Sequence, residues 1–346
     1  MSSKTWTSQA DWYGWSSRSF AGKQIDFITT VNSLTLCAYT FLDDMESGMN
    51  GTIPTNSYSA GIAGKVFYDN AQAFSGVLSI KTVGSAGDNY IQVFPTTTVT
   101  ARTMECYYYQ TGAPTGNKMI LLMLINAAGN SVVGLGVGTN GHYYYSDKNS
   151  TWTDSTIVCT NTTWHRLKIS YDSVGNTAKG WADGTLLGSW GSTQTAKSLG
   201  GFELTENLST SQTTWFDNLK VWEAYVTADN VYPTTYSNSP ATINYQYDAG
   251  GQSRWNSLSF TATKPTNTNV RFRFKTAATQ AGLAAATYSG YYTVSGSSFT
   301  DVTNNRWVEM EIELSSTDTS VTSQLDDVTL DYTVLGSTRI TGMRIS

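Results

Sequence analysis

Short runs of alternating apolar and polar residues recur along the chain, separated by clusters of Gly, Asn, Asp and Ser. Such alternation is typical of strands with one buried face. The clearest runs span residues 270–275, 307–314 and 325–334, and the continuous apolar run at 119–125 indicates a central strand covered on both faces. No stretch of ten residues has the spacing of an amphipathic helix. The pattern therefore predicts an all-β protein.

Turn residues between these runs predict hairpins. Residues 126–130 (Asn-Ala-Ala-Gly-Asn) join two strands, and Gly175-Asn176 and Asp183-Gly184 join the next ones. In the strand at 163–172, Leu167, Ile169 and Tyr171 share one face. We expect that face to point into the core.

The 346 residues are enough for two or three domains. Changes in the pattern divide the chain into five parts. They are an aromatic N-terminal arm (1–41) that serves as an anchor, a first domain (42–226), a linker (227–237), a smaller second β-sandwich (238–335) and a C-terminal tail (336–346).

Composition narrows the class of protein. Charged residues make up only 14% of the chain and the net charge is −5, which argues against a nucleic-acid partner. No apolar run is long enough to span a bilayer, and the N-terminus has no secretory h-region. The three cysteines form neither a disulfide framework nor a zinc site. A polar but weakly charged surface without a signal is typical of a virion protein, which is made in a host cytoplasm and exposed extracellularly.

Three segments resemble a known family. Residues 163–172 (Thr-Trp-His-Arg-Leu-Lys-Ile-Ser-Tyr-Asp) and their double hairpin to Gly188, an opening strand at 43–48 and a closing strand at 215–222 follow one another in the expected order. Together they resemble the concanavalin-like lectin/glucanase (laminin-G-like) jelly roll. Residues 255–325 resemble a β-sandwich module of phage structural and bacterial surface proteins. The first fold carries lectins, hydrolases, lyases and adhesive modules, so the resemblance implies architecture rather than activity.

Three glutamates, Glu309, Glu311 and Glu313, alternate on one strand, as the catalytic acids of concanavalin-like glucanases do. They lie in the second domain rather than in the lectin-like one. We interpret them as a solvated strand face and predict that Arg271, Arg273 and Lys275 lie opposite them on a neighbouring strand. We assign no catalytic residue.

Asp217 is in phase with Leu219 and Val221, which predicts a carboxylate on the core face. A buried carboxylate needs a partner. The resemblance implies a structural Ca²⁺ held by Asp217 with Asp44 and Glu46 of the opening strand, and the alternative is a hydrogen-bonded structural aspartate. No other cofactor is required.

Aromatic residues supply the candidate ligand contacts, because flat rings stack on the apolar faces of sugars. The chain has 11 Trp and 21 Tyr. The candidate glycan-binding residues are Tyr107, Tyr109, Tyr143, Tyr145 and Trp181. The competing explanation is that aromatic residues are favoured in strands regardless of ligand.

Together these features favour a non-enzymatic virion structural or appendage protein: a phage head fibre, decoration protein or tail adhesin. Its partners would be other virion proteins, bound through the arm, and host-surface glycans. The sequence is also compatible with a homo-oligomer. The alternative is a polysaccharide-active enzyme, such as a glycoside hydrolase, or its carbohydrate-binding accessory module. A lesser alternative is a bacterial surface adhesin, at the cell surface or secreted.

Overall fold

The computed structural model is all-β and divides into two compact units. It describes residues 2–6, 25–26, 34–36, 38–39, 41–43, 45, 49–52, 59–60, 65–83, 88–94, 98–115, 119–148, 151–207, 213–236 and 239–336. Unit 2 is formed by Tyr39–Pro233, and unit 1 by Met1–Ala38 with Thr234–Ser346. The prediction of an all-β chain with β-sandwich architecture is confirmed.

Unit 2 is a sandwich of two antiparallel sheets, named sheet B and sheet C. Sheet B has the order β16-β15-β14-β9-β18-β7-β6, with β4 beside β18. Its strands are β4 (Phe41–Asp43), β6 (Val66–Asp69), β7 (Ser79–Val83), β9 (Ala101–Gln110), β14 (Trp164–Asp172), β15 (Thr177–Ala182), β16 (Thr185–Trp190) and β18 (Thr213–Trp222).

Sheet C has the order β13-β12-β11-β10-β17-β8-β5. Its strands are β5 (Ser59–Ala60), β8 (Asp88–Val93), β10 (Met119–Asn126), β11 (Ser131–Val137), β12 (His142–Ser146), β13 (Trp152–Val158) and β17 (Leu199–Asn207). β10 lies between β11 and β17, and its side chains from Leu121 to Ile125 are buried, as its apolar run predicts. The core between the sheets includes Cys106, Leu167 and Ile169 of sheet B and Leu122 and Leu135 of sheet C.

The predicted hairpins of unit 2 are present. β10 pairs with β11, β14 with β15, and β15 with β16. Asp183 and Gly184 both have positive φ, 48° and 86°, which is the backbone of a tight hairpin turn. The opening strand β4 pairs with the closing strand β18.

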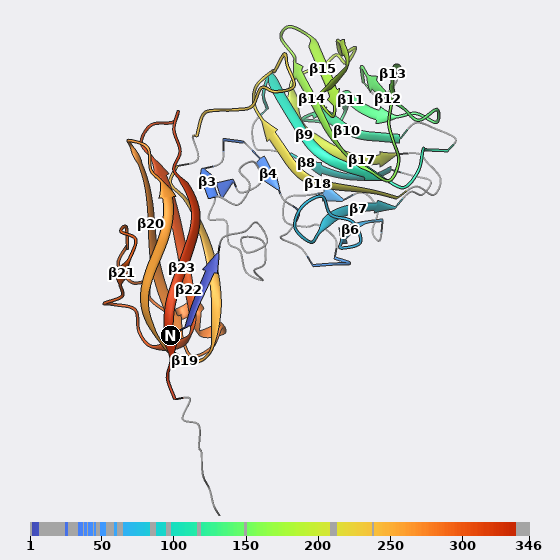
Figure 1. Cartoon of the computed structure of the whole chain (residues 1–346). Coiled ribbons are helices and arrows are strands. Elements are labelled where there is room, and N and C mark those ends of the chain that lie inside the picture. Colours follow the sequence, from blue (N-terminus) through green and yellow to red (C-terminus); the bar gives the residue numbers. More distant parts are fainter. Residues whose placement is uncertain are drawn as a thin grey trace, which may run out of the picture. The chain divides into compact units, whose positions relative to one another are not determined.

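In unit 1 one long strand, β19, pairs with two other strands, β22 and β23. Figure 1 shows its long strands side by side. β19 pairs with β22 through residues 241–248 and with β23 through residues 253–263. The strand turns between these stretches at Gly250, whose φ of 79° favours glycine. The elements of unit 1 are β1 (Ser2–Trp6), β2 (Ile25–Asp26), β3 (Leu34–Leu36), β19 (Ala241–Thr263), β20 (Thr268–Ala277), η1 (Ala281–Ala285), β21 (Ser297–Ser298), β22 (Asn305–Ser316) and β23 (Gln324–Val334).

The N-terminal arm enters unit 1 as a strand. β1 pairs antiparallel with β23, so that Trp6 lies opposite Val328. The Trp6 side chain is fully buried, with its ring 6.4 Å from that of Tyr245 and 6.2 Å from that of Tyr247. The described start of the arm therefore belongs to unit 1.

The predicted charge pairing between β20 and β22 is confirmed. Arg271 lies opposite Glu313, Arg273 opposite Glu311 and Lys275 opposite Glu309. Their ion pairs span 2.8, 2.6 and 3.0 Å.

This strand face is nevertheless not solvated, which corrects our interpretation of the three glutamates. They are only 5–6% exposed. Tyr288 and Tyr291 cover them: Tyr288 lies beside Arg273 and Lys275 and donates to Glu309, and Tyr291 packs on Arg271.

The structure also describes two of the three cysteines and bears on the expectation about membrane spans. Among the cysteines, Cys106 and Cys159 are buried free thiols, and Cys37 lies outside the described residues. In the part of the chain that the structure describes, no helix has the length and apolarity needed to cross a membrane.

Candidate functional site

One face of sheet B, the face that points away from sheet C, carries a row of aromatic side chains. The register places Trp164 of β14 opposite Tyr109 of β9, and Tyr109 opposite Trp215 of β18. Trp215 in turn lies opposite Lys81 of β7, which lies opposite Phe67 of β6. Residues directly opposite one another on antiparallel strands point to the same face. We call Trp164, Tyr109, Trp215, Lys81 and Phe67 the aromatic row.

The rings of the aromatic row hold one another in place. The ring of Tyr109 lies 5.6 Å from those of both Trp164 and Trp215. The Lys81 ammonium lies 5.1 Å from the Trp215 ring and 5.5 Å from that of Phe67. Asp69 accepts a hydrogen bond from the Trp215 indole and pairs with Lys81 at 3.3 Å. Trp164, Tyr109 and Phe67 remain half-buried, so the row is a pre-organised, partly open surface.

Phe74 forms a second level above the row. Its ring lies parallel to that of Tyr107, with centroids 3.6 Å apart and an interplanar angle of 13°. The Trp164 ring meets Phe74 at 67°. Because Phe74 is 42% exposed, its outer face is open to solvent. Phe74 and Trp164 thus form an aromatic corner beside the row.

Asp217 fixes the loop that carries Phe74. Its Oδ2 accepts the backbone N–H groups of Phe74 and Ser75 at 2.8 and 3.1 Å, and its Oδ1 accepts that of Asn218 at 2.7 Å. This matches the predicted alternative of a hydrogen-bonded structural aspartate.

The predicted core orientation of Asp217 is wrong. Asp217 lies opposite Tyr107, whereas Lys220 lies opposite Glu105, so the strand contains a bulge. Asn218 adopts φ 50° within it. The extra residue reverses the alternation, and Asp217 shares the outer face with Tyr107 while Leu219 and Val221 enter the core.

Replacing Asp217 with alanine is expected to lower the free energy of unfolding of unit 2 by about 2–3 kcal/mol, because charge-assisted hydrogen bonds to the Phe74 loop are lost. Hydrogen exchange at the amides of Phe74 and Ser75 should accelerate. Phe74→Ala is the matched control, since it removes the ring and keeps the carboxylate. Unchanged exchange in Asp217→Ala would contradict the anchoring role.

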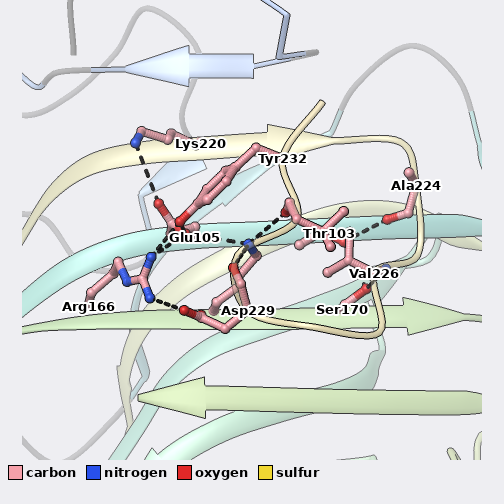
Figure 2. Close-up of polar contacts among 11 residues, drawn as sticks. Thr103, Glu105, Arg166, Ser170, Lys220, Ala224, Val226, Asp229 and Tyr232 are labelled. Carbon is pink, nitrogen blue, oxygen red and sulfur yellow. Dashed lines mark hydrogen bonds and ion pairs between the residues drawn. The ribbon is translucent and has the colours of Figure 1, made fainter. Parts of the chain in front are cut away.

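A charged cluster lies on the same face as the row, because Glu105 and Arg166 are in phase with Tyr109 and Trp164. Figure 2 shows the polar contacts of this cluster. Glu105 is almost completely buried, and its carboxylate lies 3.6 Å from Arg166, 3.8 Å from Lys168 and 3.5 Å from Lys220. Tyr232 donates to Glu105 at 2.9 Å, and Arg166 pairs with Asp229. We call Glu105, Arg166, Lys168, Lys220, Asp229 and Tyr232 the charged cluster.

Residues 223–233 form a strap across the charged cluster, which Figure 2 shows crossing the strands of sheet B. Thr103 donates to the carbonyl of Ala224, and Ser170 accepts the N–H of Val226. Lys168 donates to the carbonyls of Asp229 and Val231 at 2.7 and 3.0 Å. The first part of the expected linker is therefore held against unit 2 as far as Pro233.

Burial displaces the pKa values of the cluster. It lowers the pKa of Lys168 to about 8, although Glu105 opposes the shift. Burial and the Glu105 carboxylate raise the pKa of Tyr232, which therefore stays protonated and donates. Burial, then Glu105, also raises the pKa of Tyr107. Clusters of displaced pKa values are common at functional sites.

His165 lies at the core side of β14 and is held from both ring nitrogens. Nδ1 lies 2.6 Å from the Asp183 carboxylate and Nε2 lies 2.8 Å from the carbonyl of Thr160. The Asp183 carboxylate and the Thr160 carbonyl accept from the protonated ring, whereas the Thr160 hydroxyl, 3.0 Å from Nε2, can donate or accept. Burial opposes this charge, but the bonds to Asp183 and Thr160 raise the pKa of His165 above 6.5.

Unit 2 is therefore expected to lose stability as pH rises through the raised pKa of His165. The contribution is complete below the unfolded pKa of about 6.5 and disappears above the folded pKa. Urea unfolding between about pH 6 and 7.5 measures it below the titration of Lys168. His142→Gln, at the half-exposed second histidine, should retain the decline. A decline of the same size in His165→Gln would contradict the assignment.

The structure separates the predicted ligand-binding residues. Tyr107 and Tyr109 share the outer face of sheet B, whereas Tyr143 and Tyr145 belong to β12 of sheet C. Tyr143 is 2% exposed, against the Tyr108 ring, and Tyr145 stacks on Trp190. Trp181 is 3% exposed.

The calcium site remains a prediction. Asp44 and Glu46 lie outside the described residues. Among the residues that the structure does describe, no group of three His, Cys, Asp or Glu side chains is arranged to hold a metal ion.

Most of the aromatic row was absent from our predicted site. Phe67 and Lys81 come from two consecutive strands, β6 and β7, whereas Trp164 and Trp215 come from strands far from these in the chain. From the sequence, alternation places Trp164 on the same face as Arg166, and Tyr109 on the same face as Tyr107. It does not show that their strands lie side by side.

Comparisons with known proteins give structural neighbours. No family model matches the sequence, and no curated protein matches it. An endo-β-1,4-glucuronan lyase from the fungus Trichoderma reesei matches with a TM-score of 0.40 and 13% identity over 54% of this chain and 96% of its own. A sialidase matches with a TM-score of 0.41 and 6% identity over 55% of this chain and 19% of its own. A carbohydrate esterase of the Shiga toxin-encoding bacteriophage phi24B matches with 0.37 and 11%, over 49% and 90%.

These three names are those of carbohydrate-active enzymes. The comparison overturns our prediction of a non-enzymatic virion structural or appendage protein and of a chain without enzymatic activity. No residue role is transferred from these neighbours, and the candidate site rests on the geometry described above.

Proposed function

We propose that this chain is a polysaccharide-active protein in which a concanavalin-like jelly roll holds a glycan chain along the aromatic row. The observation that carries the proposal is the continuous register Trp164–Tyr109–Trp215–Lys81–Phe67 across five neighbouring strands. Strands lie about 4.8 Å apart, so the row spans about 19 Å, which suits an extended polymer rather than a single sugar.

The chemistry of the row fits a glycan. Pyranose rings present C–H faces to aromatic rings and hydroxyl groups at their edges. Trp164, Tyr109 and the exposed face of Phe74 offer the rings, and the Lys81–Asp69 pair beside them offers a donor and an acceptor. The mutual packing of the rings keeps them in place before a ligand arrives, which reduces the entropy lost on binding.

Tyr107 is the proposed proton donor. It lies next to the row, opposite Arg166, and Phe74 stacks on its ring. Burial raises its pKa and the Arg166 cation opposes that rise, so the hydroxyl is protonated at neutral pH and is available to donate a proton.

Binding is tested by affinity electrophoresis of the full chain against a panel of polysaccharides. Trp164→Ala and Tyr109→Ala should each weaken binding about 10- to 100-fold, as loss of a central aromatic contact does. Phe94→Ala is the matched control, because Phe94 is an exposed ring of unit 2 outside this face. Binding unchanged in both row variants would place the ligand elsewhere.

Turnover is tested by release of reducing ends from the polysaccharide that binds. Tyr107→Phe keeps the ring on Phe74 and removes the hydroxyl, so we expect turnover to fall about 10²- to 10⁴-fold with binding intact. Unchanged turnover would exclude Tyr107. Binding by the unaltered chain without any turnover would identify a carbohydrate-binding accessory module instead.

A further inference from the structure

The face that carries the aromatic row is electrostatically balanced. Among the described residues of the row, its anchors and the charged cluster, the cations are Lys81, Arg166, Lys168 and Lys220, and the carboxylates are Asp69, Glu105, Asp217 and Asp229. These groups thus carry equal numbers of positive and negative charges.

Each of these cations already has a partner within the protein. Lys81 pairs with Asp69, and Arg166 pairs with Asp229 and Glu105. Lys220 pairs with Glu105. Lys168 is fully buried and donates to two strap carbonyls. An anionic ligand would have to break such a pair and leave a carboxylate unpaired, which is unfavourable at a partly buried site.

We infer that the aromatic row takes a neutral polysaccharide and discriminates against polyuronates and other anionic glycans. This inference rests on the proposed function and names the substrate class of the same site. Stacking on uncharged rings provides the affinity. The Asp69 carboxylate, beside the only cation of the row, repels a ligand carboxylate that approaches Lys81 and accepts hydrogen bonds from the hydroxyls of a neutral sugar.

The test measures binding of the full chain to neutral β-glucan, xylan and mannan and to alginate and polygalacturonate, at low salt and at about 0.5 M NaCl. Screening at the higher concentration removes most long-range attraction between exposed charges. We expect a neutral polymer to bind with a Kd that changes less than about twofold between the two salts, and polyuronates to bind at least about tenfold more weakly.

Asp69→Asn provides the matched variant. It keeps an oxygen to accept from the Trp215 indole but frees the charge of Lys81. We expect its affinity for polyuronates, relative to its affinity for the neutral polymer, to rise about fivefold or more at low salt and to lose this gain at about 0.5 M NaCl.

The outcomes separate the two levels of the proposal. Tight, salt-sensitive binding of polyuronates by the unaltered chain, or no gain in Asp69→Asn, would overturn the inference and leave the glycan site in place. Failure of every polymer to bind would overturn the proposed function itself. Neutral binding that Trp164→Ala abolishes, together with the gain in Asp69→Asn, supports both.

Discussion

Replacing Glu105 with alanine is expected to destabilise unit 2 by about 3–5 kcal/mol, because it leaves buried cations without their carboxylate. Glu105 is almost fully buried, within 4 Å of the side-chain nitrogens of Arg166, Lys168 and Lys220. Tyr232 would also lose its acceptor. Urea unfolding of the full chain measures the change without adding salt.

Two further variants make this result specific to charge. Lys179→Met removes a cation that donates to the strap carbonyl of Thr227 outside the cluster, and it should cost less than about 1 kcal/mol. The double variant Glu105→Ala with Lys168→Met should recover part of the lost stability, because it removes a buried charge together with its partner. If Glu105→Ala unfolds like Lys179→Met, the charged cluster does not stabilise the fold.

Trp6→Ala is expected to destabilise unit 1 by about 3–5 kcal/mol, the usual effect of deleting a fully buried large aromatic side chain. Trp6 lies on β1, opposite Val328, and packs near Tyr245 and Tyr247. Hydrogen exchange in β23 should accelerate, since β1 is one of its hydrogen-bonding neighbours.

Ser3→Ala is the control for this experiment, because Ser3 lies on the same strand and is exposed. Its effect should stay within about 0.5 kcal/mol. Equal exchange in β23 for both variants would show that Trp6 and β1 do not stabilise unit 1.

Alternation predicted most of the strands, and even one pairing, because the rule is local. Val270, Phe272 and Phe274 on β20, and Val308, Met310, Ile312 and Leu314 on β22, enter the core as their phase predicts. The same phase places Arg273 opposite Glu311. Opposite charges on neighbouring runs were sufficient to identify the two strands as partners.

The same rule failed where the backbone departs from it. The bulge at Asn218 adds one residue to β18, so counting from Leu219 assigned Asp217 to the wrong face. Val334 is in phase with the buried Tyr332, but at 38% exposed it lies at the open end of β23. Alternation cannot detect an inserted residue, because the side-chain identities on either side of it remain plausible for a strand.

The candidate site was the least predictable part of the molecule. The aromatic row depends on the register of five strands drawn from residues 66 to 222, and registers between distant segments leave no local signal. The strap has no periodicity at all. The strap is held by hydrogen bonds to its backbone carbonyls, such as those that Lys168 donates. The identity of the strap's side chains does not predict these bonds.

The pairing of β1 with β23 determines when unit 1 can fold during synthesis. β1 is synthesised first, but its partner strand comes from the end of the described chain. All of unit 2 is translated between the two. Domains generally fold as units during synthesis. Unit 2 can therefore fold on the ribosome before the strands that bury Trp6 have been synthesised. Unit 1 therefore assembles after unit 2, and the nascent chain exposes the unpaired strand β1 with its Trp6 until β23 has emerged.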